Sequence, residues 1–187
     1  SHPRPHQESP PQIQSLGLLT SAIRDPDPVL FLEPLRGYRG IRGLVPDEEH
    51  IVPIGQANLV KKGNDVVIIS WSYQVELSRR VAESLEEEGI SAAVLDLRSI
   101  VPLDVEALTQ IVTHCGRAVV VQEAPETGGF ASEIIATIND ECFWSLEAPV
   151  ARVSGFDVPY PVGMLENLYV PDEVRIRSAV LKTMEIN

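Results

Sequence analysis

Three nearly continuous apolar runs, each followed by a segment of helical periodicity, constrain how this chain of 187 residues can fold. The runs cover residues 66–71, 91–97 and 117–123, and runs this apolar are typical of strands that are buried on both faces. Strands that alternate with helices at this spacing pair in parallel through right-handed crossovers. We therefore predict an α/β fold, a three-layer α/β/α sandwich with a mostly parallel sheet.

The segments that follow these runs carry apolar residues three or four positions apart, which is typical of helices with one buried face. Gly89 and Gly116 are placed to end the first two helices, and Asp104 is placed to cap the start of the second. The apolar positions of the four expected helices are Leu77, Val81 and Leu85; Val105, Leu108 and Val112; Ile134, Ile138 and Cys142; and Ile176, Val180 and Met184.

Shorter strand patterns flank the apolar runs. One of them and the first apolar run surround Lys62-Gly63-Asn64, and this arrangement predicts a β-hairpin. Residues 150–155 predict a further short strand.

The chain divides into three segments by composition. Residues 1–15 hold four prolines and few apolar residues, which predicts a disordered or extended tail. Residues 16–53 predict a short helix, a short buried strand at 29–33 and a long linker from residue 34. The regular pattern of strands and helices occupies residues 54–187.

The charge of the chain indicates what kind of partner it binds. Acidic residues outnumber basic ones by 27 to 15, so the net charge of −12 repels nucleic acid and anionic membrane surfaces and favours basic partners. Residues 122–147 contain six acidic side chains and no Lys or Arg. No apolar run reaches the roughly 18 residues that cross a bilayer. Two cysteines outside any CxxC motif point to a reducing compartment.

Gly128 and Gly129 follow the third apolar run, at a strand-to-helix turn where glycines often bind phosphate. The loop matches neither the GxGxxG nor the GxxxxGK[ST] spacing, and the nearby Glu123 and Glu126 would repel a phosphate. A sharp turn for close packing is the favoured interpretation. A stand-alone module that binds a small molecule or nucleotide through Gly128 and Gly129 remains the alternative.

Catalytic and metal-binding patterns are weak in this sequence. Glu123 and Glu126 lack further polar partners for acid–base chemistry, the serines have no recognisable base, and no His, Cys and Asp cluster has metal-ligand spacing. We assign no catalytic, cofactor-binding or metal-binding residue.

Several long segments together resemble one known family. They are "AIRDPDPVLFLEP", "RGYR", "VPIGQANLVKKGNDVVIISW", "VLDLRSIVPLDVEAL", "GRAVVVQEAPETGGFASEI", "SLEAPVARVSGFDVPYP" and "YVPD". The family is the beta subunit of the thiamine-diphosphate-dependent decarboxylating component of 2-oxo acid dehydrogenases, and the resemblance covers about residues 16–187. It implies that 54–187 is the transketolase-type C-terminal assembly domain and that 16–53 is a remnant of the pyrimidine-binding domain plus a linker.

The resemblance implies a heterotetramer of alpha and beta subunits with thiamine diphosphate and Mg²⁺ between them. The intact enzyme would oxidatively decarboxylate a 2-oxo acid, branched-chain or pyruvate, and transfer the acyl group to lipoyl. The family's catalytic groups lie upstream of the matched segments, and His2 and His6 cannot be equated with them. We therefore expect no cofactor and no turnover on this chain alone.

The resemblance also implies how the chain meets its partners. They are the alpha subunit, a second beta subunit and the basic peripheral subunit-binding domain of the acyltransferase. The carboxylates that meet this basic domain correspond to Glu147 and to the C-terminal carboxylate on Asn187. The expected location is the cytoplasm of a prokaryote or the mitochondrial matrix of a eukaryote.

Overall fold

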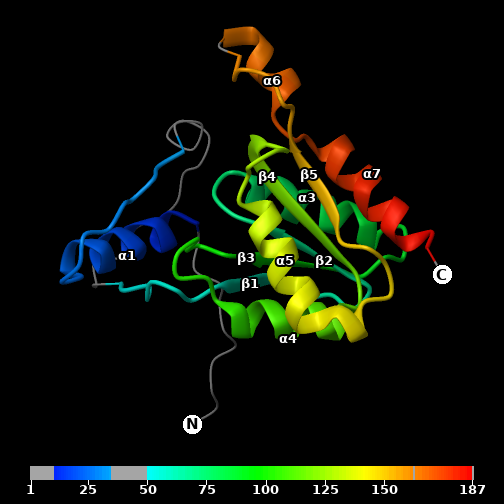
Figure 1. The fold of residues 1–187 in the computed structure, drawn as a ribbon, viewed down its shortest axis with the longest axis horizontal. Coiled ribbons are helices and arrows are strands. Elements are labelled where there is room, and N and C mark those ends of the chain that lie inside the picture. Colours follow the sequence, from blue (N-terminus) through cyan, green and yellow to red (C-terminus); the bar gives the residue numbers. More distant parts are fainter. Residues whose placement is uncertain (1–10, 35–49, 162, 187) are drawn as a thin grey trace.

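The computed structural model describes residues 11–34, 50–161 and 163–186, and a five-stranded sheet forms its centre (Figure 1). The strands lie in the order β1-β3-β2-β4-β5, and only β1 runs antiparallel to its neighbour. Their bounds are Asn58–Lys61 (β1), Val66–Ser70 (β2), Ala92–Asp96 (β3), Ala118–Pro125 (β4) and Ala151–Gly155 (β5).

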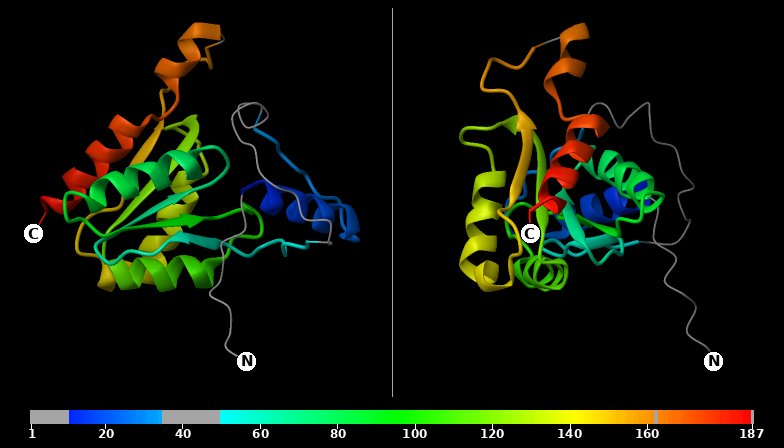
Figure 2. Two further views of the ribbon diagram at one scale, coloured as in Figure 1. Left: turned by 180° about the vertical axis from the view of Figure 1, so that it is seen from behind. Right: turned by 90° about the vertical axis from the view of Figure 1, so that its right-hand side faces the viewer.

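Helices cover both faces of this sheet, as the turned views in Figure 2 show. Helices α3 and α7 pack on one face, and α4 and α5 pack on the other. The predicted three-layer α/β/α sandwich with a mostly parallel sheet is therefore confirmed. The helix bounds are Pro11–Arg24 (α1), Gln74–Glu86 (α3), Val105–Cys115 (α4), Ala131–Cys142 (α5), Glu166–Tyr169 (α6) and Glu173–Met184 (α7), with 3-10 turns at Phe143–Ser145 (η1) and Gly163–Leu165 (η2).

Local sequence signals predicted the helix ends well. Asp104 Oδ1 accepts a hydrogen bond from the Ala107 amide at 3.0 Å, which caps α4, and Asp172 caps α7 through the Arg175 amide in the same way. Gly116 ends α4 with a φ of 68°. Most of the predicted stripe residues are buried, whereas Leu77, Val105, and Met184 are partly exposed at the edges of their helices.

The predicted hairpin around Gly63 is wrong, because β1 pairs with β3 and not with β2. Residues 62–65 instead carry the chain across the first residues of β3, where the amides of Asn64 and Asp65 both donate to the Ser91 carbonyl at 2.9 Å. The backbones are so close here that a Cβ on Gly63 would lie 2.2 Å from the carbonyl carbon of Ala92. The crossing places β3 between the two strands that the sequence pattern suggested were paired.

The N-terminal segment differs from the prediction in two places. Helix α1 begins at Pro11, so residues 11–15 are helical and do not belong to a tail; residues 1–10 and 35–49 lie outside the described part of the chain. Residues 29–33 form no strand, and their leucines are exposed. The pattern was that of a strand, but a strand needs a neighbouring backbone to pair with, and the described residues provide none at this position.

Helix α1 touches the sandwich at a few points. Ser21 Oγ donates to the Val52 carbonyl at 2.6 Å, and Arg98 Nε donates to Gln14 Oε1 at 3.3 Å. Within the described ranges, neither α1 nor any other helix is long and apolar enough to cross a membrane.

Asp96, at the end of β3, gives the fold a predicted pH dependence. Burial raises the pKa of this carboxyl from 3.8 to about 6, although its Oδ1 accepts the Arg98 amide at 3.0 Å. A raised native pKa stabilises the fold below the unfolded pKa, and this stabilisation is lost as pH rises through the native pKa. Between about pH 4 and pH 6 the free energy of unfolding is therefore expected to fall by roughly 2–3 kcal/mol, since one pKa unit corresponds to about 1.4 kcal/mol.

Asp96→Asn tests this expectation, because the amide can still accept the Arg98 N–H but does not titrate. Urea unfolding between pH 4 and pH 7 measures how the free energy of unfolding changes with pH. We expect the decrease that Asp96 causes to disappear in Asp96→Asn and to persist in Asp140→Asn, which changes an exposed carboxylate on α5. A slope unchanged by Asp96→Asn would show that another group carries it.

Candidate docking site

Glu147 lies just beyond η1, at the end of the sheet where the strands begin. Its amide donates to the Gly116 carbonyl at 2.7 Å, while its side chain is 59% exposed. The carboxylate forms an ion pair with Arg117, whose own side chain is only 15% exposed. A Cβ at Gly116 would lie 2.9 Å from the Glu147 carboxyl carbon, so this glycine both ends α4 and leaves room for the carboxylate.

Arg117 connects Glu147 to the last described residue of the chain. Its Nη2 donates to the Ile186 carbonyl at 3.4 Å. Asn187, the second predicted partner-binding residue, lies outside the described residues, but the residue before it is thus within reach of the Glu147 ion pair. The sequence prediction missed Arg117, although a signal was present: it is the only Lys or Arg between Arg98 and Arg152.

The Gly128-Gly129 loop is organised by the buried side chain of Gln122. Gln122 Oε1 accepts the Ala131 amide at 2.8 Å, and its Nε2 donates to the Pro125 carbonyl at 2.9 Å. A Cβ on Gly129 would lie 2.0 Å from that Nε2. The Gln122 amide therefore occupies the position at the start of α5 that an anion would need, so the nucleotide-loop alternative is not supported and the close-packed turn is.

Glu123 and Glu126 do not form a carboxylate pair. Glu123 Oε1 accepts Gln74 Nε2 at 3.2 Å, whereas Glu126 forms an ion pair with Arg152 at 2.7 Å. Arg152 also donates to the Ser132 hydroxyl at 2.7 Å, which holds the loop against β5. These contacts give both carboxylates a structural role.

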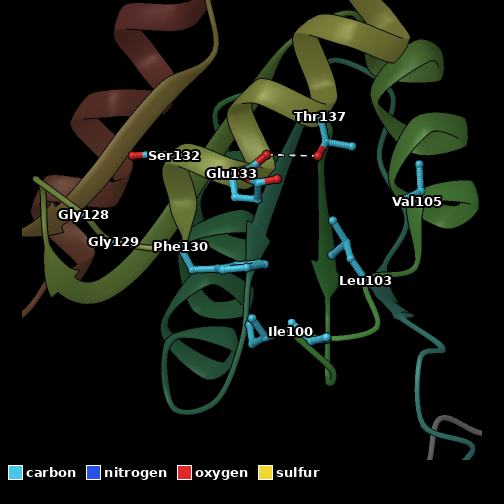
Figure 3. A pocket seen from close by; sticks show the side chains of 10 residues that line it. Ile100, Leu103, Val105, Gly128, Gly129, Phe130, Ser132, Glu133 and Thr137 are labelled. Carbon is cyan, nitrogen blue, oxygen red and sulfur yellow. Dashed lines mark hydrogen bonds between the residues drawn. The ribbon is translucent and has the colours of Figure 1, made fainter.

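An open hollow of about 660 Å³ lies beside the same loop (Figure 3). Its lining is mostly apolar, with Phe130, Ile100 and Leu103 gathered around it and Glu133 as the one acidic side chain. Among the described residues, no Lys or Arg lines the hollow, so this lining offers no cation for a phosphate. This chemistry also argues against a nucleotide site.

The crevice between the carboxyl ends of β2 and β4 is where an α/β sheet of this topology usually binds a ligand. Here a hydrogen bond from Gln74 to Glu123 joins the first residue of α3, which follows β2, to the end of β4. The hydroxyls of Ser70 and Ser78 are buried close by in sequence without a protein partner among the described residues, and buried water commonly satisfies such groups. In the described parts of the chain, no cluster of three or more His, Cys, Asp or Glu side chains could hold a metal ion.

An apolar arm extends from the carboxyl ends of the strands. It comprises residues 156–161 and 163–168, and Figure 1 shows α6 standing away from the sandwich. Met164 is 93% exposed and Leu168 73%. At its base, the Arg175 guanidinium lies 4.6 Å from the centre of the Phe156 ring, so the arm is anchored while its tip is bare.

Comparison with known proteins identifies the fold family. Residues 55–176 match the family described as "Transketolase, C-terminal domain", which is more than half of the chain. The chain belongs to the transketolase C-terminal domain family. A solved chain described as "Split gene transketolase, inactive beta4 tetramer" agrees, with a TM-score of 0.65 and 27% identity over 79% of this chain and 47% of that one.

Two relatives confirm the resemblance seen in the sequence. The mitochondrial 2-oxoisovalerate dehydrogenase subunit beta of Dictyostelium discoideum is 44% identical to this chain, over 92% of this chain and 46% of the Dictyostelium protein. The pyruvate dehydrogenase E1 component subunit beta of Bacillus subtilis is 43% identical over 90% of this chain and 52% of its own length. The chain thus spans about half the length of the curated relatives that it matches.

Proposed function

We propose that this chain is the C-terminal part of a 2-oxo acid dehydrogenase beta subunit, where it mediates beta–beta association and docks the acyltransferase core. The observation that carries the proposal is 43–44% identity to two such beta subunits over nine-tenths of the chain. The parent enzyme would oxidatively decarboxylate a 2-oxo acid and transfer the acyl group to lipoyl. Relatives of the branched-chain and pyruvate types match almost equally well, so we propose both substrates as candidates.

Thiamine diphosphate and Mg²⁺ belong, in this proposal, to the intact heterotetramer. The described residues do not fit the cofactor: the α5 N-terminus is occupied by Gln122, the adjacent loop carries Glu123 and Glu126, and no carboxylate cluster suits a metal. The chain alone is therefore proposed to be inactive. Release of CO₂ from pyruvate or 2-oxoisovalerate by the purified chain with thiamine diphosphate and Mg²⁺ would contradict this.

Two exposed apolar surfaces support an assembly role. One is the apolar arm, and the other is the segment after α1, where Leu30 and Leu32 are 84% and 78% exposed. Contiguous apolar surface of this kind is typical of contacts between subunits or domains. We propose that the alpha subunit, a second beta subunit and the remainder of the beta subunit cover these surfaces. The Dictyostelium relative is mitochondrial and the Bacillus relative is bacterial, so the proposed location is the mitochondrial matrix or the bacterial cytoplasm.

Docking is assigned to Glu147 and to Asn187. An exposed carboxylate beside a partly buried arginine keeps acceptor positions free for Arg or Lys of a basic domain. The acidic stretch 122–147 adds to the attraction.

Glu147→Ala is expected to weaken binding of the acyltransferase's peripheral subunit-binding domain about tenfold or more, since it removes a charge-assisted hydrogen bond. Deleting Asn187 is expected to weaken it in the same direction. Isothermal titration calorimetry at low salt measures both. The matched control is Glu106→Gln, which removes an exposed charge at the far end of α4, about 15 Å along the helix.

Equal affinity of Glu147→Ala, the Asn187 deletion and wild type would reject this docking contact. Equal weakening by Glu106→Gln would show that net charge, and not the position of Glu147, controls binding.

A further inference from the structure

Trp144 is the most exposed large apolar side chain among the described residues, at 94%. Its neighbour Phe143 is 58% exposed. The two rings contact each other edge to face, with centroids 5.1 Å apart and planes at 87°. An exposed aromatic pair contrasts with the other tryptophan of the protein, Trp71, which packs against Phe130.

The backbone that carries this pair is fixed on both sides. Cys142 and Ala148 lie on either side of the turn, and only 2% and 5% of their surfaces are exposed. Between them the Leu146 amide donates to the Phe143 carbonyl at 3.3 Å, and the Glu147 amide donates to the Gly116 carbonyl at 2.7 Å. The rings are therefore presented on an ordered turn, and their exposure does not come from a loose loop.

The charges beside the aromatic pair are negative. Asp140 and Glu141 precede it at the end of α5, Glu147 follows it, and all three are exposed. Arg117, the one Lys or Arg between Arg98 and Arg152, is already paired with Glu147. Aromatic faces among carboxylates attract the guanidinium and ammonium groups of Arg and Lys.

We propose that Phe143 and Trp144 form the apolar centre of the docking surface around Glu147. Arg and Lys side chains of the partner domain stack on these two rings. Other basic groups of the same domain form ion pairs with Glu147. Trp is enriched among residues that dominate binding energy at the centre of an interface, and carboxylates at the rim steer association. This inference rests on the proposed docking function and adds the residue that would supply most of the affinity.

The test is a titration of the basic peripheral subunit-binding domain into wild type, Trp144→Ala and Trp144→Phe. We expect Trp144→Ala to weaken binding at least about tenfold, and Trp144→Phe to weaken it less, because phenylalanine keeps an aromatic face. Val174→Ala is the control, since Val174 is 74% exposed on α7, which the proposal places in no interface. It is expected to bind like wild type.

Tryptophan fluorescence gives a second readout. Binding is expected to shift or quench the emission of wild type and to leave Trp144→Phe unchanged, because Trp71 lies in the sandwich. Wild-type affinity in Trp144→Ala, together with weakened binding in Glu147→Ala, would overturn this inference and leave the docking function standing. Absence of binding by the wild-type chain would overturn both.

Discussion

Gly63→Ala is expected to lower the free energy of unfolding by about 3 kcal/mol, since the added methyl would meet backbone and not a flexible side chain. Its Cβ would lie 2.2 Å from the Ala92 carbonyl carbon, 2.2 Å from the Ala93 amide nitrogen and 2.6 Å from the Ser91 carbonyl oxygen. Relief would require moving residues 62–65 away from β3. That movement would break the two hydrogen bonds to Ser91 that direct the chain from β1 to β2.

Gly89→Ala is the matched control for this prediction. A Cβ at Gly89 meets nothing within 4 Å, and its cost is limited to the left-handed φ of 85°, about 1 kcal/mol. Urea unfolding measures the free energy of unfolding of both variants. Gly63→Ala reports the steric collision, and Gly89→Ala reports the backbone strain alone. Equal stability of the two variants would contradict the tight crossing over β3.

Gln122→Leu is expected to cost about 2–3 kcal/mol, because leucine has a similar size but cannot replace the amide's two hydrogen bonds. The Ala131 amide would lose its Gln122 partner at a buried position, and the Pro125 carbonyl would lose its Gln122 partner at a half-buried one. The loop with Gly128 and Gly129 would then lose the contact that holds it to the start of α5.

Gln110→Leu provides the comparison, since Gln110 lies on the exposed face of α4 and bonds only to Glu106. We expect a change within about 0.5 kcal/mol there. Chemical denaturation measures both variants. If Gln122→Leu were as mild as Gln110→Leu, the loop would be held by Arg152 and the glycine turn, and Gln122 would not be its organiser.

Signals that act within a few residues were predicted correctly from the sequence. Asp104 and Gly116 mark the two ends of α4 because the bonds that they satisfy lie within one turn. The parallel strands were predicted from the apolar runs for a similar reason. A strand that is covered on both faces is apolar along its whole length, whichever strands lie beside it.

Pairing between distant segments was not predictable in the same way. The pattern around Gly63 fits a hairpin locally, and only the position of β3 shows that the two strands are separated. Residues 29–33 have the composition of a strand, but composition does not state whether a partner is present. Arg117 was missed because its pairing with Glu147 spans 30 positions of the chain.

The most direct test of the assembly role is the stoichiometry of docking. We propose that the docking site lies near the twofold axis between two beta subunits, where one bound domain excludes a second. Calorimetric titration of the peripheral subunit-binding domain into the wild-type chain is therefore predicted to saturate at about one domain per two chains. The affinity is predicted to fall with added salt, as expected for charge-assisted contacts. No measurable binding at low salt, or binding that is indifferent to salt, would contradict the account.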